Sequence, residues 1–171
     1  IIISSQLASH LSFTESARMK SSAIIFFLIG FGCLLLPNTV HAAGVVEQGV
    51  SDDKILVGSS CPLSGHVSYL GQGVVTGLNT YFKYINSQGG IFGRKIELIT
   101  NDDDYNPPLM ISNVTKMIDK DKVFALIGLV GTPTTLTVVG ISQERKIPLL
   151  FSITGAIELR RPLKRYIMNL R

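Results

Sequence analysis

Cysteine and histidine are scarce in this sequence of 171 residues, which contains two cysteines and three histidines. Cys33 lies in an apolar N-terminal run, so Cys61 is left without a partner for an internal disulfide. A cysteine nucleophile needs a histidine base, but the one histidine beyond residue 42 is His66, five residues after Cys61 in the same expected loop. We therefore expect Cys61 to be a buried or incidental thiol. Cysteine and histidine spacings typical of metal sites are absent, as is the G-x-S-x-G motif, so the sequence predicts no metal and no enzyme.

Motifs that hold phosphate groups are missing as well. The stretch "GLVGTPTT" (128–135) lacks the lysine of a phosphate-binding loop. The glycines at 71, 73 and 77 miss the dinucleotide pattern because Thr76 stands where its third glycine belongs, and we expect a long loop over 59–70 instead of a tight turn. We expect these glycines to cap a helix and let it pack closely. No cofactor is predicted.

The run Asp102-Asp103-Asp104 raises the question of a calcium site. It lacks the ligand spacing and the terminal glutamate of an EF-hand loop. We expect one of these acids to end a strand and another to cap the next helix.

Positive charge is not concentrated on any motif that binds nucleic acid. The chain has 16 lysines and arginines against 12 acids, and the basic residues are scattered except for a group at 160–165. A nucleic-acid footprint requires clustered bases on one face together with a supporting motif. We expect no nucleic-acid partner.

The N-terminal region is typical of an export signal. Met19 and Lys20 precede an apolar run from Ala23 to Leu36, and small or apolar residues lead up to Ala42. This run is shorter than the roughly 18 residues that span a membrane, and its flanks fit a secretory signal peptide. We expect a signal peptide over 19–42, cleavage near Ala42, a mature part over 43–171 and a periplasmic location. Residues 1–18 are expected to be a non-native upstream extension, with a long signal n-region as the alternative.

Hydrophobic periodicity along the mature part alternates between strand and helix. Strands are expected over 54–60, 93–104, 123–130, 147–154 and, near the end of the sequence, 165–171. Helices are expected over 71–90, 107–121 and 132–146. Strands separated by helical crossovers predict an α/β fold, with a parallel sheet covered by helices on both faces in Rossmann-like βαβ repeats.

A ligand site in such a sheet lies beyond the carboxyl ends of the strands. Thr132 and the amides around it open a helix, where partial positive charge favours a carboxylate. Thr154 and Gly155 offer a hydroxyl and exposed backbone at the neighbouring strand end, and Tyr69 and Leu70 provide apolar walls from the first loop. Together they suit a small zwitterion such as an amino acid, although each residue alone also fits an ordinary cap or turn.

Several stretches resemble the periplasmic binding proteins for branched-chain amino acids and related amides, which serve ABC importers. The resemblance covers nearly all of the mature part, in order and with the family's spacing. The blocks that carry it are "GGIFGRKIEL" (89–98), "VFALIGLVGTPT" (123–134) and "TGAIELR" (154–160). It departs from the family at His66, where proline is usual, and at Asp104, where glycine is common.

This resemblance implies a type I fold of two α/β lobes that close on the ligand, of which the sequence matches only the first. We therefore expect a truncated N-terminal lobe with the second lobe missing. The resemblance assigns the ligand's carboxylate and ammonium to Thr132, Ile153, Thr154 and Gly155, and the side-chain pocket to Tyr69 and Leu70. It also implies an ABC permease as partner.

Two other functions stay open at this stage. A ligand-sensing extracytoplasmic domain of a membrane receptor would use the same fold. An exported enzyme with a similar sheet would need a base or metal ligand beyond Arg171. Leucine-like amino acids, short amides and urea all remain candidate ligands.

Overall fold

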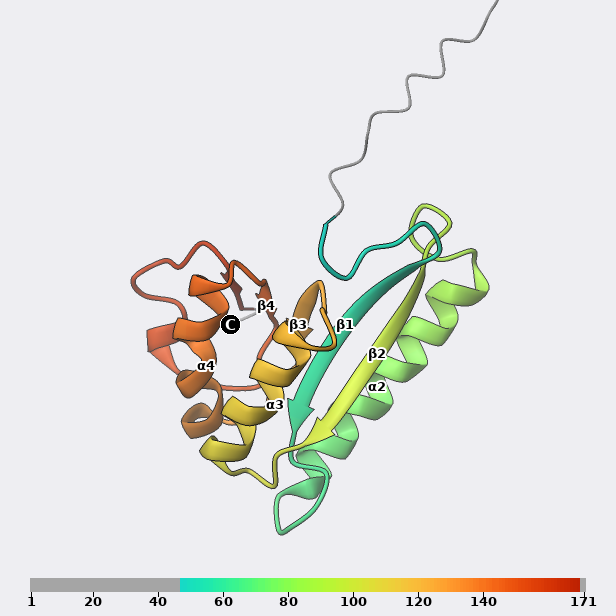
Figure 1. Ribbon diagram of the computed structural model, residues 1–171. Coiled ribbons are helices and arrows are strands. Elements are labelled where there is room, and N and C mark those ends of the chain that lie inside the picture. Colours follow the sequence, from blue (N-terminus) through green and yellow to red (C-terminus); the bar gives the residue numbers. More distant parts are fainter. Residues whose placement is uncertain (1–46, 170–171) are drawn as a thin grey trace, which may run out of the picture. The chain divides into compact units, whose positions relative to one another are not determined.

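The computed structural model describes residues 47–169 (Figure 1). The expected upstream extension (1–18) and signal peptide (19–42), with its cleavage point near Ala42, lie outside the described residues. Helices and strands alternate as the periodicity predicts. Their bounds are β1 Lys54–Cys61, α2 Ser68–Ser87, β2 Lys95–Asp102, α3 Pro107–Asp119, β3 Ala125–Ile127, α4 Thr132–Glu144, β4 Leu149–Leu150, η1 Ile157–Leu159 and β5 Ile167–Met168. Between residues 47 and 169, no helix has the length and apolar character needed to cross a membrane.

The strands form one parallel sheet in the order β2-β1-β3-β4-β5. Helix α2 packs on one face, where Phe82 joins Val57 and Ala125 in a small buried cluster. Helices α3 and α4 cover the other face, as Figure 1 shows. The larger core there draws on both helices and on the sheet, through Met110, Val114, Met117, Val138, Leu126 and Leu149. The predicted α/β class, with helices on both faces of a parallel sheet, is confirmed.

The connection between β1 and α2 is shorter than the sequence predicts. It spans residues 62–67 because β1 continues to Cys61 and α2 already begins at Ser68. Gly71 is buried in the first turn, where a Cβ would lie 1.9 Å from the carbonyl oxygen of Pro62. Only glycine permits that approach, so the expected close packing is confirmed here. It is wrong for Gly73 and Gly77, which have nothing within 4 Å of a Cβ position.

The end of α2 follows the glycine cap that the sequence predicts. Gly89 adopts a left-handed φ of 99°. The N–H groups of Gly89 and Gly90 donate to the carbonyls of Asn86 at 3.3 Å and Ile85 at 3.0 Å, which is the Schellman arrangement.

Strands β3 and β4 are much shorter than the predicted ranges 123–130 and 147–154. Gly128 follows β3 with a φ of 67°, and Phe151 follows β4 with a φ of 53°, so the backbone leaves the extended conformation directly after each strand. Parallel pairing resumes at a single bridge between Val130 and Ile153. Apolar composition predicts burial at these positions, but it carries no information about left-handed backbone.

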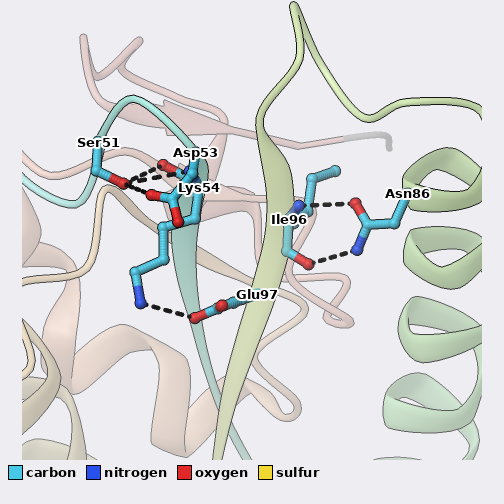
Figure 2. Close-up of polar contacts among 6 residues, drawn as sticks. All are labelled: Ser51, Asp53, Lys54, Asn86, Ile96 and Glu97. Atoms are coloured by element: carbon cyan, nitrogen blue, oxygen red, sulfur yellow. Dashed lines mark hydrogen bonds and ion pairs between the residues drawn. The ribbon is translucent and has the colours of Figure 1, made fainter.

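The outer strand β2 is held to α2 by a side-chain clamp (Figure 2). The Asn86 side chain accepts from the N–H of Ile96 at 2.8 Å and donates to its carbonyl at 2.9 Å. Lys54 of β1 pairs with Glu97 of β2 at 3.1 Å across the exposed surface. The clamp satisfies backbone groups that an edge strand would otherwise present to another chain.

Candidate functional site

The carboxyl ends of β2, β1, β3 and β4 meet at one edge of the sheet, because all the strands are parallel and adjacent in that order. The loops beyond them contact one another in sequence along this edge. Asp102, the last residue of β2, accepts from the N–H of Leu63 after β1 at 2.8 Å. The side chain of Tyr105 lies against Gly131 after β3, and Thr132 is bonded to Thr154 after β4. The predicted convergence of four loops is therefore confirmed.

Thr132 and Thr154, here called the threonine pair, face each other across two strand ends. Their Oγ1 atoms are 2.5 Å apart. The Gly131 N–H donates to the Ile153 carbonyl at 3.1 Å, and the Ala156 N–H donates to Thr154 Oγ1 at 3.1 Å. These bonds fix both backbones on either side of the pair, so two hydroxyl groups from separate loops occupy one place at the sheet edge.

Thr132 is also the first residue of α4, as the sequence predicts. The first N–H groups of a helix have no acceptor within it, and the N-cap residue Gly131 has no side chain to supply one. The Thr135 N–H is the first to bond back, to the Gly131 carbonyl at 3.1 Å. The start of α4 therefore combines unpaired backbone donors, partial positive charge and the threonine pair, which suits an anionic group.

The other predicted site residues come from the loop after β4 and from the start of α2. Ile153 adjoins the pair, with its backbone paired to Leu129 and Gly131 and a side chain that is 48% exposed. The Gly155 carbonyl accepts from the Arg160 guanidinium at 3.1 Å. Tyr69 and Leu70 belong to the first turn of α2, because the helix begins early, so the placement of both in the first loop is wrong.

An acidic turn, residues 102–105, is the feature that the sequence reasoning did not recognise as part of the site. Asp103 is fully buried and accepts from the Ser60 hydroxyl at 2.9 Å and from the Tyr105 N–H at 3.0 Å. Asn113 of α3 donates to the same Ser60 oxygen at 3.1 Å. The helix cap that we expected from an aspartate comes instead from Asn106, which accepts from Leu109 at 3.3 Å. The expectation that an aspartate ends the strand is confirmed by Asp102, the last residue of β2.

The pKa values of two neighbouring carboxyl groups in this turn are shifted in opposite directions. Burial raises the pKa of Asp103 above its ordinary value of 3.8, against hydrogen bonds from Ser60 and Tyr105. The folded state thus holds this proton more tightly than the unfolded state, so the Asp103 contribution to the free energy of unfolding falls as pH rises through the folded pKa. For Asp102, burial also acts to raise the pKa, but hydrogen bonds from Ser64, Leu63 and Asp104 hold it below 3.8. Its stabilising contribution is lost as pH falls through that lowered value.

Two features bear on reactive chemistry at this edge, namely the Cys61 thiol and side chains that could bind a metal ion. Cys61 is buried, which confirms the buried thiol that the sequence predicts, and burial raises the pKa of this thiol to about 11. Within residues 47–169, no group of three or more His, Cys, Asp or Glu side chains could hold a metal ion.

A family model described as periplasmic binding protein matches residues 54–167. The chain belongs to the periplasmic binding protein family. This confirms the resemblance that the sequence blocks indicate, and the family is one of non-enzymatic solute-binding proteins.

Relatives of this periplasmic binding protein include the Leu/Ile/Val-binding protein homolog 3 of Brucella melitensis. The two are 29% identical over 113 residues, which cover 66% of this chain and 30% of the relative. The structure of a possible leucine/isoleucine/valine-binding protein from Rhodopirellula baltica is 30% identical with a TM-score of 0.66, over 75% of this chain and 33% of that one. A branched-chain amino acid transporter substrate binding protein of Streptococcus pneumoniae, solved with isoleucine, is 26% identical with a TM-score of 0.56, over 58% and 28%. The chain thus spans about a third or less of the length of these relatives.

The two departures from the family pattern differ in their structural consequences. His66 is exposed in the loop before α2. Asp104 has a φ of 47°, a left-handed conformation that glycine adopts freely and aspartate tolerates. Its Oδ1 would lie 2.3 Å from a Cβ on Gly65, so the side chain packs directly on the β1–α2 connection. The acidic turn of this periplasmic binding protein therefore contacts the neighbouring loop through a side chain that glycine lacks.

Proposed function

We propose that this chain is the N-terminal lobe of an extracytoplasmic solute-binding protein that captures a small amino acid or amide for an ABC importer. A branched-chain amino acid is the proposed ligand class. The observation that carries the proposal is the threonine pair at the uncapped start of α4, at the carboxyl edge of a parallel sheet, where ligands of α/β folds bind. The names of the Brucella and Streptococcus relatives support the ligand class.

The proposed binding mode divides the ligand between polar and apolar groups. The carboxylate would accept from the amides at the start of α4 and from the hydroxyls of Thr132 and Thr154, whose hydrogen bond to each other would be exchanged for bonds to the ligand. Backbone groups of Ile153 and Gly155 would contact the ammonium group or the rest of the ligand backbone. Tyr69 and Leu70, 68% and 38% exposed on the first turn of α2, would line the side-chain pocket.

Closure by a second lobe completes this proposal. An exposed start of α4 is hydrated, and covering it would remove water and strengthen each charge-assisted bond. We propose export to the periplasm and a membrane permease as the partner that receives the ligand. Residues 43–171 alone would bind weakly or not at all, because the second half of the contacts would be lacking.

Calorimetric titration of the full-length protein tests the proposal. The titrants are leucine, isoleucine, valine, acetamide and urea, and at least one should show saturable binding. Thr132→Val and Thr154→Val should each weaken that binding about tenfold or more, because each removes one hydrogen bond to a charged group. Thr137→Val is the matched control, since its hydroxyl bonds within α4 to the Thr134 carbonyl at 2.6 Å.

Three results would count against parts of this proposal. Absence of binding to every titrant would refute the ligand class, and equal losses in the control and the site variants would refute the role of the threonine pair. Micromolar binding of leucine by residues 43–171 alone would refute the need for a second lobe.

A further inference from the structure

The ring of Tyr105 lies directly on the backbone of Gly131, the residue before Thr132. A Cβ built on Gly131 would be 2.4 Å from Cε2 and 2.8 Å from Cζ of the tyrosine. Tyr105 follows β2 and Gly131 follows β3, and β1 lies between these strands in the sheet. The side chain therefore reaches across the end of β1 to meet the start of α4.

The position of Tyr105 is fixed by its own turn. Asp104 and Tyr105 both adopt left-handed backbone, with φ values of 47° and 56°. Such conformations are unfavourable for residues other than glycine and persist where the surroundings enforce them. Here the buried carboxylate of Asp103 accepts from the Tyr105 N–H at 3.0 Å, and the Asp103 carbonyl accepts from the Asn106 N–H at 2.7 Å. The turn thus fixes the backbone from which the ring projects, without help from the ligand.

Gly131 in turn determines how the first peptide of α4 is directed. Its φ of 98° and ψ of 142° lie in a region that is essentially restricted to glycine. Residues with such freedom are held in a single conformation only by their contacts. On one side Gly131 is bonded through its N–H to Ile153, and on another the Tyr105 ring covers its Cα.

We propose that Tyr105 is a positioning residue for ligand binding at the threonine pair. Its ring holds the Gly131–Thr132 peptide so that the Thr132 amide and hydroxyl face the ligand carboxylate. This inference rests on the proposed function. A purely structural role predicts a different result, because loss of the ring would then lower stability and leave the recognition of the carboxylate unchanged.

The test compares Tyr105→Phe, Tyr105→Leu and Tyr105→Ala in the full-length protein. Tyr84→Ala is the control, since Tyr84 is a tyrosine of α2 that is 60% exposed. The probes are leucine and leucinamide, which differ in the carboxylate. Affinities come from calorimetry, and amide hydrogen exchange at residues 131–135 provides a readout without ligand.

The contact is made by ring carbons, so Tyr105→Phe should bind leucine within about twofold of the unaltered protein. Tyr105→Leu and Tyr105→Ala should bind leucine about tenfold more weakly or worse, equivalent to about 1.4 kcal/mol. Leucinamide affinity should change much less, so the preference for leucine should shrink. Exchange of the Thr135 amide, which is bonded to the Gly131 carbonyl, should accelerate in both variants but not in Tyr84→Ala.

The inference is overturned if the unaltered protein binds leucine and Tyr105→Leu binds it equally well. It is also overturned if both probes weaken by the same factor, or if exchange at residues 131–135 is unchanged. Failure of the unaltered protein to bind leucine or any other titrant is a separate outcome, which refutes the proposed ligand class and this inference with it.

Discussion

Replacement of Gly131 by alanine perturbs both the backbone before Thr132 and the contact with the Tyr105 ring. The added Cβ would lie 2.4 Å from Cε2 of Tyr105 and 2.9 Å from the Thr134 hydroxyl. The backbone φ of 98° adds a conformational cost of about 1–3 kcal/mol for any residue with a Cβ. Overpacking against the ring adds about 1–3 kcal/mol more. Gly131→Ala should therefore lower the free energy of unfolding by about 2–6 kcal/mol.

Gly140→Ala in α4 is the matched control. A Cβ at Gly140 would meet nothing within 4 Å. The same change at this exposed interior helix position should raise the free energy of unfolding by about 0.5–1 kcal/mol, because alanine loses less conformational entropy than glycine.

Urea unfolding followed by circular dichroism measures both variants, with the slope of the transition compared to that of the unaltered chain. A double variant, Tyr105→Ala with Gly131→Ala, isolates the clash. Its destabilisation should be smaller than the sum of the single effects by about 1 kcal/mol or more, since removing the ring makes room for the Cβ. The reasoning fails if Gly131→Ala lies within about 1 kcal/mol of the unaltered chain, or if the two changes are additive.

Three further predictions concern buried polar groups near the same edge. Thr135 is fully buried and its hydroxyl has no partner among residues 47–169, so Thr135→Val should leave stability equal or raise it by about 1 kcal/mol in urea unfolding. Thr134→Val should instead lower the stability by about 1 kcal/mol, because the Thr134 hydroxyl donates to a backbone carbonyl at 2.6 Å. A larger loss of stability in Thr135→Val than in Thr134→Val would contradict these hydrogen-bond assignments. Burial raises the pKa of Asp103, so part of the free energy of unfolding should fall as pH rises above about 4. Asp103→Asn should remove that pH-dependent part. An unaltered dependence of the free energy of unfolding on pH would refute this. In a Cys33→Ser background, burial and the pKa of about 11 should keep the Cys61 thiol unreactive toward Ellman's reagent at pH 8 until denaturant is added, whereas rapid native labelling would contradict its burial.

The helices of this fold could be predicted closely because their signals are local. The proline start of α3, the periodic apolar positions 110, 114, 117 and 118, and the glycine cap after α2 each depend on residues a few positions apart. The strands were predicted in number, in order along the chain and in parallel direction, but their order in the sheet was not predicted and β3 and β4 were predicted too long. Their ends depend on the left-handed backbone of Gly128 and Phe151, and a phenylalanine gives no local signal for that conformation.

The candidate site could be predicted only in part, for a related reason. Hydroxyl and glycine residues after the strands identify Thr132 and Thr154, because strand order brings those ends together. Tyr105 and Asp103 could not be found in this way, because the Tyr105 ring crosses the end of β1 to reach Gly131 and Asp103 is bonded to Ser60 inside β1, and neither contact follows from the residue types at the strand ends. The one sequence feature that could have identified them is the run of three aspartates at the end of a strand. We interpreted that run as a strand end and a helix cap, and so did not expect it to contact a neighbouring loop.

Three non-glycine residues with left-handed backbone lie at the carboxyl edge of the sheet, Asp104, Tyr105 and Phe151, together with the glycines 128 and 131; a further one, Phe92, lies between Gly90 and Gly93 in the turn before β2. A fold that needed only stability would avoid such positions or assign them all to glycine, because each unfavourable conformation costs about 1–3 kcal/mol. Lys122 and Lys146 also have positive φ, but they follow helices, where one left-handed residue commonly ends the helix. At the strand ends no such general need exists. What the conformations achieve there is to shorten β3 and β4, turn the Gly131–Thr132 peptide toward Thr154 and hold the Tyr105 ring against it. The left-handed residues beside the threonine pair thus set the local geometry of the proposed site.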